Sequence, residues 1–179
     1  SQASVIRQAL KNAGCEPSTV DYIEAHGTGT SLGDPIELGA LDQVFSQGRK
    51  SDHPLLVGSI KTNVGHLEAA AGIAGITKII LQMQHRLLVP SLHSAVLNSE
   101  LDLRDSPFTI QKTLQVWSGS DGENTRQPLR AGISSFGGGG ANAHLILESY
   151  ENNNVQSEES GNSTDELIVL SARSADRLN

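Results

Sequence analysis

The segment LLVGSIKTNVGHLEAAAG, residues 55–72, joins an apolar run to a small-residue stretch through a polar turn. Residues 55–60 have the pattern of a buried strand, and residues 69–87 that of a long apolar helix. A strand that runs into a helix N-terminus directs backbone N–H groups and a positive dipole end to one place. Lys61 at the end of the strand adds a cation there, and His66 and Glu68 add a proton carrier and a carboxylate in the first turns of the helix. The segment predicts a reaction centre, although a polar helix start with a satisfied histidine would explain it as well.

A second segment, EAHGTGT at residues 24–30, has the same organisation. It follows a short apolar strand over residues 20–25 and releases His26 into a loop of glycines and hydroxyls. Gly27 and Gly29 allow close approach of the backbone to a ligand, and Thr28 and Thr30 offer two hydroxyls to a polar, amide-bearing chain. The alternative is a tight turn with a capping threonine.

The third segment is a run of four glycines, residues 137–140, between two apolar runs at 130–136 and 141–148 that predict strands. Because glycines have no side chain, their backbone N–H groups can come close to a ligand, and such groups can line an oxyanion hole. A flexible linker is the alternative interpretation. Flanking strands of matching apolar character favour the ligand site.

The rest of the chain alternates between helical and strand patterns. Residues 4–13 form an amphipathic helix that Gly14 ends. A second helix begins at Asp34 and ends near Gly48, with Asp34 and Glu37 interpreted as capping residues. Short strands follow at 108–110 and 114–117. We interpret His85 and His93 as structural, because both lie away from the strand ends where the candidate catalytic residues are found.

Composition excludes several classes of protein. The chain has 179 residues, 37% of them hydrophobic, which suits one soluble domain with a short appendage. A net charge of -7 without a basic face argues against nucleic-acid binding. No apolar run approaches the ~20 residues of a membrane span, and no leader pattern is present, so we expect a cytoplasmic protein. Cys15 is the one cysteine, and its place after a helix end beside Glu16 predicts an ordinary surface or half-buried thiol.

Taken together and in order, the three segments closely resemble the C-terminal half of the β-ketoacyl synthase (ketosynthase) domain of modular polyketide synthases. The resemblance covers residues 1–150. Residues 151–165 have the composition of a flexible linker, and residues 166–179, which begin with a strand-like run, resemble the start of the region that follows such a domain. The resemblance implies a thiolase-like α/β fold in which a mixed sheet is packed between helices, with this chain as one of two similar halves.

The resemblance also implies a reaction, the decarboxylative Claisen condensation of an acyl thioester with a malonyl unit. The malonyl unit is carried on the 4′-phosphopantetheine arm of an acyl carrier protein, and no cofactor or metal is bound directly. Two histidines would bind the malonyl thioester carbonyl, and other side chains would support them. By resemblance the catalytic residues are His26 and His66, the supporting residues are Lys61, Asn63 and Glu68, and the pantetheine-binding residues are Thr28 and Thr30. The oxyanion and acyl pocket would comprise Phe136, Gly137, Gly138 and Gly139.

Two departures from the family pattern matter. The nucleophilic cysteine of the N-terminal half has no counterpart here, since Cys15 lies in a different context. We therefore expect this chain to be inactive alone, to need a partner half that carries the cysteine, and to homodimerise once the domain is complete. Gly138 replaces a bulkier residue, which resembles synthases served by a free-standing acyltransferase.

Three other functions remain open. The chain could be a structural or docking piece of a split synthase, or part of a member that transfers chains without condensing them. A metal hydrolase that uses Glu24, His26, His66 and Glu68 is a weak alternative, because the histidines lack the helical spacing of a zinc motif.

Overall fold

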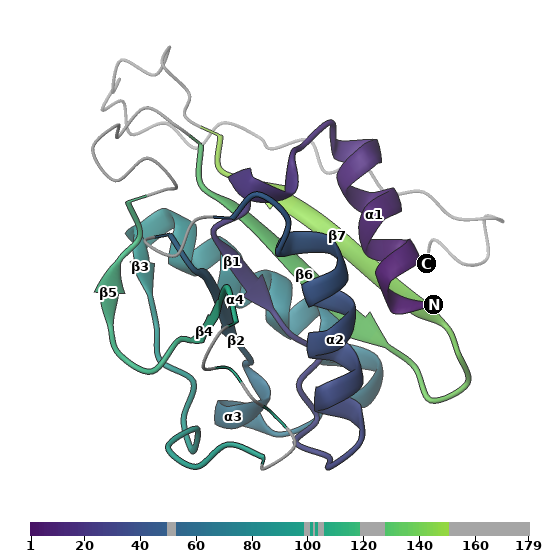
Figure 1. The fold of residues 1–179 in the computed structure, drawn as a ribbon. Helices are drawn as coiled ribbons and strands as arrows, with labels where there is room; N and C mark the ends of the chain where they lie inside the picture. The colour runs from purple at the N-terminus through teal and green to yellow at the C-terminus, as the bar shows by residue number, and fades with distance from the viewer. Residues whose placement is uncertain (50–52, 99–100, 102, 104–105, 119–127, 151–179) are drawn as a thin grey trace, which may run out of the picture.

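A five-stranded sheet lies at the centre of the computed structural model, which describes residues 1–49, 53–98, 101, 103, 106–118 and 128–150. The strand order is β4-β2-β1-β6-β7 (Figure 1). The first four strands in this order run parallel, and β7 is antiparallel to β6. Their bounds are β1 Tyr22–Glu24, β2 Leu55–Gly58, β4 Phe108–Ile110, β6 Arg130–Phe136 and β7 Asn142–Glu148.

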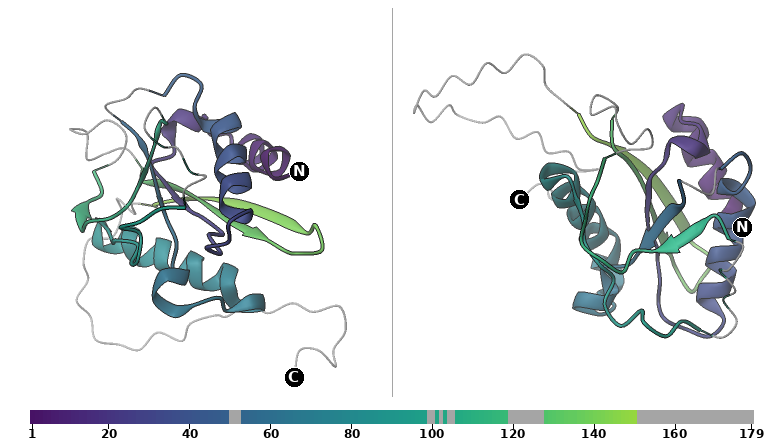
Figure 2. Two further views of the ribbon diagram at one scale, coloured as in Figure 1. Left: turned by 60° about the horizontal axis from the view of Figure 1, so that its bottom comes forward. Right: turned by 60° about the vertical axis from the view of Figure 1, so that its left-hand side comes forward.

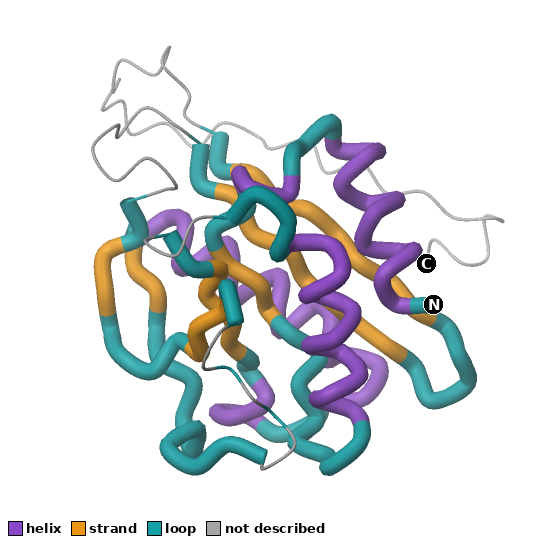
Figure 3. Tube along the Cα trace, in the orientation of Figure 1, coloured by secondary structure: helices purple, strands orange, loops and turns teal. Residues whose placement is uncertain are grey.

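Helices cover both faces of this sheet, so the predicted arrangement of a mixed sheet between helices is confirmed. The helices α1 (Gln2–Ala13) and α2 (Gly33–Phe45) lie on one face, and α4 (Ala71–His85) lies on the other (Figure 2). Three short helices connect these layers, η1 (Pro17–Thr19), α3 (Lys61–Val64) and η2 (Glu68–Ala70). A small antiparallel ribbon of β3 (Leu87–Leu88) and β5 (Gln115–Val116) lies beside the sheet (Figure 3).

The central strand β1 is buried on both faces, as expected for a parallel strand between two helical layers. Ile23 points into the apolar cluster formed with α1 and α2, and Tyr22 into the cluster formed with α4. Each large apolar side chain that is fully buried contributes about 1.5–3 kcal/mol. The two clusters therefore fix β1, and with it the start of the His26 loop, from both sides.

Most predicted elements are present, with ends displaced by a few residues. Gly14 ends α1 in the left-handed conformation, with φ 63°, as predicted. The predicted strand within 166–179 and the linker at 151–165 lie outside the described residues. None of the helices in the described part of the chain has the length and apolar character needed to cross a bilayer.

One prediction about the opening segment is wrong. His66 and Glu68 do not lie in the first turns of the long helix, because the chain forms α3, a loop and η2 before α4 begins at Ala71. Gly65 interrupts the helix with φ 73° and ψ −171°, a conformation that favours glycine. Glu68 has φ 48°, which also departs from α-helical geometry. The segment therefore bends between Gly65 and Glu68, and His66 lies at this bend.

Candidate active site

The structure brings the two predicted histidines together. His26 follows the end of β1 and His66 follows α3, and their ring centroids lie 5.4 Å apart with the planes at 86°. Phe136, the last residue of β6, packs against His26 with a centroid distance of 5.9 Å. Because β1 and β6 are parallel neighbours, their carboxyl ends meet at one edge of the sheet. The fold thus places residues from all three sequence segments at one point.

The surroundings of His26 keep its imidazole neutral. Burial lowers the pKa of His26 to about 4, and the nearby charges of Lys61 and His66 add to this effect. The buried Nδ1 atom of the ring has no hydrogen-bond partner among the described residues. A neutral imidazole is suited to hydrogen-bond a ligand without giving up a full proton.

Glu37 holds the backbone of the His26 loop. Its carboxylate accepts hydrogen bonds from the N–H of His26 at 2.8 Å and from the N–H of Gly27 at 2.9 Å. The side chain is only 4% exposed, and burial raises the pKa of its carboxyl group. The interpretation of Glu37 as a helix cap is therefore wrong, because its partners are in the loop after β1.

Asp34 acts in the same way, and its predicted role as an N-cap is also wrong. The helix α2 begins one residue earlier, at Gly33, and the Asp34 carboxylate accepts the N–H of Gly29 at 3.1 Å. Two carboxylates from the first turns of α2 thus bind three backbone N–H groups of the loop. The conformation of the His26 loop therefore depends on the packing of α2 against the sheet.

The two threonines of the loop lie side by side, with their hydroxyl oxygens 3.3 Å apart. Thr30 accepts the N–H of Gly33 at 3.0 Å, so its hydroxyl supports the start of α2. Thr28 is half-buried and Thr30 is exposed. A hydroxyl pair at a loop edge can bind amide groups, since each hydroxyl can donate and accept.

His66 is exposed, and its orientation is set by the backbone. Its Nδ1 accepts the N–H of Glu68 at 2.9 Å, which leaves Nε2 as the free ring nitrogen. Lys61 lies close by, and burial lowers its pKa, an effect that the carboxylates of Glu24 and Glu37 oppose. Asn63 is exposed, and its Oδ1 accepts a hydrogen bond from a threonine hydroxyl at 3.1 Å.

The glycine run forms a tight turn between β6 and β7, whose pairing continues up to Phe136 opposite Asn142. The interpretation as a flexible linker is therefore wrong. The N–H of Gly137 and the N–H of Gly140 bond within the turn. Gly138 and Gly139 are exposed, and a Cβ at either would have no atom within 4 Å outside its immediate neighbours. Their N–H groups are the ones available to a ligand.

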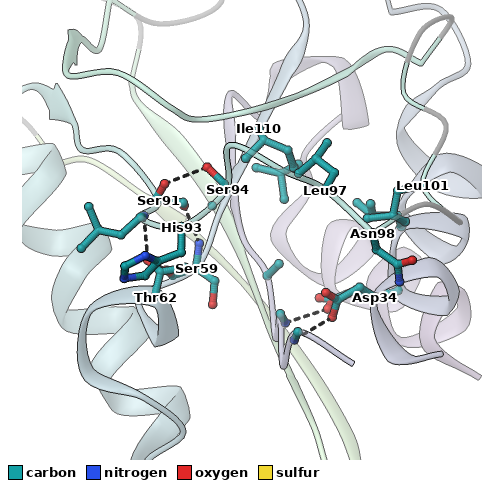
Figure 4. Close-up of a pocket in the computed structure, with 18 of the residues that line it drawn as sticks. Asp34, Ser59, Thr62, Ser91, His93, Ser94, Leu97, Asn98, Leu101 and Ile110 are labelled. Atoms are coloured by element: carbon teal, nitrogen blue, oxygen red, sulfur yellow. Dashed lines mark hydrogen bonds between the residues drawn. The ribbon is translucent and has the colours of Figure 1, made fainter. Parts of the chain in front are cut away.

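A cavity of about 550 Å³ lies beside this site, between α2 and the segment 91–98 (Figure 4). Ser59 and Ser91 lie on one side of it and Asp34 on the other, and Gly27 also lines it. His26 and His66 are not among its lining residues, so the imidazole pair lies outside it. His93 does line it, which shows that our placement of His93 away from the strand ends is wrong.

Sequence reasoning missed a buried cluster below the histidines. Glu24 and Lys78 form an ion pair of 2.8 Å with side chains 2% and 4% exposed. The signal was a charged residue inside an otherwise apolar strand and another inside an apolar helix, which is rare unless the charges are paired. The metal-hydrolase alternative required the Glu24 carboxylate at the histidines, but this carboxylate is bound to Lys78. Within the described ranges, no group of three or more potential ligands is placed to hold a metal ion.

Comparison with known proteins now identifies the family. Residues 1–95 match the family model "Beta-ketoacyl synthase, C-terminal domain", and residues 98–179 match "Ketoacyl-synthetase C-terminal extension". The chain belongs to the β-ketoacyl synthase C-terminal domain family. The ketosynthase chain is 48% identical over 181 residues to polyketide synthase PksL of Bacillus subtilis (strain 168), covering 99% of this chain and 4% of PksL. It is 47% identical over 186 residues to polyketide synthase ThaG of Burkholderia thailandensis, covering 99% of this chain and 3% of ThaG.

Solved ketosynthase structures confirm the expected thiolase-like fold. The ketosynthase from module 6 of the bacillaene synthase from Bacillus subtilis 168 is similar with a TM-score of 0.76 and 40% identity, over 85% of this chain and 27% of that one. The oxazolomycin ketosynthase domain OzmH KS7 of Streptomyces albus JA3453 is similar with a TM-score of 0.74 and 46% identity, over 84% of this chain and 25% of that one. The ketosynthase chain thus spans about a quarter of these solved structures.

Proposed function

We propose that this chain provides the decarboxylation half of a polyketide synthase active site. In partnership with a segment that carries the nucleophilic cysteine, it would catalyse decarboxylative Claisen condensation of an acyl thioester with a malonyl unit on an acyl carrier protein. The observation that supports this most directly is the edge-to-face pair of His26 and His66, 5.4 Å apart at the end of the sheet.

The chemistry requires hydrogen-bond donors at the malonyl thioester oxygen. When the bond to the carboxyl group breaks, carbon dioxide leaves and its electron pair passes into the thioester, which becomes an enolate. The enolate carbon then attacks the acyl thioester, and the cysteine sulfur leaves as thiolate. A neutral imidazole can stabilise the enolate oxygen by hydrogen bonding without protonating it, and one such donor is worth about 10²–10³ in rate. The lowered pKa of His26, about 4, keeps that ring neutral at physiological pH.

The other proposed roles follow from position. Thr28 and Thr30 would bind the pantetheine arm through their adjacent hydroxyls. Gly138 and Gly139, close to Phe136, would line the acyl pocket. Their exposed backbone N–H groups could bind the oxyanion that forms on the acyl thioester carbonyl when the enolate attacks it. The open space at Gly138 would leave more room for the acyl chain.

The partner half would bind the exposed face of α4. Ile73 is 61% exposed and Leu81 48% exposed on this helix, and an apolar groove of about 440 Å³ runs beside Leu81 between α3 and the end of α4. Apolar surface of this kind marks an interface. Cys15 cannot serve as the nucleophile, because its half-buried thiol packs against the α1 and α2 core. We also propose a cytoplasmic location and homodimerisation of the complete domain.

The decisive experiment combines this chain with the cysteine-bearing half and measures malonyl decarboxylation and condensation. We expect His26→Ala and His66→Ala to lower both rates by about 10²-fold or more. His53→Ala is the matched control, because His53 is exposed in the loop before β2 and lies outside the groove beside α4. Condensation that persists in both active-site variants would contradict the proposal, whereas decarboxylation without condensation in the wild-type pair would indicate a non-condensing member.

A further inference from the structure

A closed triangle of hydrogen bonds lies under the two catalytic loops. The Oε2 atom of Glu24 accepts the hydroxyl of Tyr22 at 2.7 Å and the ammonium of Lys78 at 2.8 Å. The same ammonium donates to the Tyr22 hydroxyl at 2.8 Å. All three side chains are buried, so this oxygen of Glu24 is held from the side of α4.

The other oxygen of the same carboxylate bonds the second loop. The Oε1 atom of Glu24 accepts the backbone N–H of Ile60, the residue immediately before α3. Glu24 is itself the last residue of β1, two positions before His26. One side chain therefore belongs to the strand that releases His26 and binds the start of the helix that leads to His66.

Glycines leave the space that this arrangement needs. A Cβ at Gly75 of α4 would lie 3.1 Å from Cγ of Glu24 and 2.5 Å from Cδ1 of Ile133. A Cβ at Gly58 of β2 would lie 2.5 Å from the Tyr22 hydroxyl. The helix and both strands can approach the carboxylate only because these positions lack side chains.

Stability alone is a poor explanation for the ion pair. Apolar residues of similar volume often replace a buried pair at no cost, because two charges must be removed from water to form it. The helix α3 has only four residues, too few to maintain its own structure without outside contacts. The start of α3 is therefore positioned by the groups that hydrogen-bond to it. Glu24 is one of these groups, and its side chain is buried and rigidly held.

We propose that Glu24 is a positioning residue that keeps His66 against His26. Its carboxylate, anchored by Lys78 and Tyr22, fixes the start of α3 relative to the end of β1. Loss of the bond to the Ile60 N–H would let α3 move and separate the two rings. The catalytic part of this inference rests on the proposed function, whereas the geometric part does not.

The test compares two double variants in the ketosynthase assembled with its cysteine-bearing half. Glu24→Gln with Lys78→Met and Glu24→Met with Lys78→Met both remove the entire ion pair, so neither leaves a lone buried charge. Only glutamine keeps an acceptor for the Ile60 N–H. We expect the glutamine variant, which keeps the acceptor but loses the Lys78 anchor, to lose about tenfold in kcat for decarboxylation, and the methionine variant to lose about 100-fold with KM little changed, since a displacement of about 1 Å can have that effect.

A second measurement is independent of activity. Nuclear Overhauser contacts between the His26 and His66 rings should be present in the wild type and the glutamine variant and absent in the methionine variant. A methionine variant that keeps both kcat and the ring contacts would overturn the inference. If His26→Ala and His66→Ala leave condensation intact, the proposed function fails, while the ring contacts still test the positioning role.

The mildest variant is Tyr22→Phe, which removes one hydroxyl and no charge, and it tests the inference if both double variants unfold. We expect kcat to fall about tenfold with weakened ring contacts, because the carboxylate loses one of its two anchors. Unchanged kcat and unchanged ring contacts in this variant would also overturn the proposal.

Discussion

Replacing Glu37 should release the His26 loop from α2. The Glu37 carboxylate accepts two backbone hydrogen bonds, at 2.8 and 2.9 Å, and each bond to a charged group is worth about 1.5–3 kcal/mol. The raised pKa shows that burial penalises the charged carboxylate, which offsets part of this gain. We therefore expect Glu37→Ala to lower the free energy of unfolding by about 2–4 kcal/mol.

Glu37→Gln should have an intermediate effect. An amide has one acceptor oxygen, so one of the two N–H groups would face the NH₂ of glutamine, and we expect a loss of about 1.5–3 kcal/mol. Both variants should also lower kcat for malonyl decarboxylation, because the backbone of His26 is no longer held in place.

Urea unfolding at pH 7 and the decarboxylation assay measure these effects. Asp42→Asn is the matched control, because Asp42 is exposed on the same helix and should change stability by no more than about 0.5 kcal/mol. The reasoning is refuted if Glu37→Ala is no more damaging than Asp42→Asn, or if Glu37→Gln is more damaging than Glu37→Ala.

Two further predictions follow from burial. His26 and His144 have native pKa values of about 4, below the unfolded value of 6.5, so the unfolded state binds their protons first and stability falls as the pH drops from 6.5 towards 4. His144 is only 7% exposed and accounts for about 3 kcal/mol of this loss. His144→Asn should therefore flatten the dependence of the free energy of urea unfolding on pH. An unchanged pH dependence would contradict the lowered pKa of His144. Gly27→Ala should destabilise by about 1–3 kcal/mol and lower activity, because Gly27 has φ 48° and a Cβ would lie 2.9 Å from that of Ser59. Gly39→Ala in α2, where a Cβ meets nothing within 4 Å, should instead stabilise by about 0.5–1 kcal/mol, and equal effects of the two substitutions in thermal unfolding would refute this argument.

The sequence alone determined the order of strands and helices and the three segments that meet at the site. Local signals were sufficient for these features: apolar periodicity, Gly14 as a helix end, and glycines beside His26 and after Phe136. The resemblance added the pairing of His26 with His66, which lie 40 positions apart by their residue numbers. The polar turn before the helix was expected, but the loop and η2 before α4 were missed, because Ala69, Ala70 and Ala71 continue the helical pattern towards His66.

Only the tertiary structure showed which buried charges support the histidines. Lys78 is 54 positions from Glu24, and the Ile60 N–H is 36 positions from it, so no local pattern links them. Glu37 looked like a helix cap because a carboxylate in the first turn usually serves its own helix. Its real partners are the N–H groups of His26 and Gly27, which packing of α2 against the sheet brings within reach. A polar group removed from water must find a partner wherever the fold supplies one, and that partner is set by packing in three dimensions.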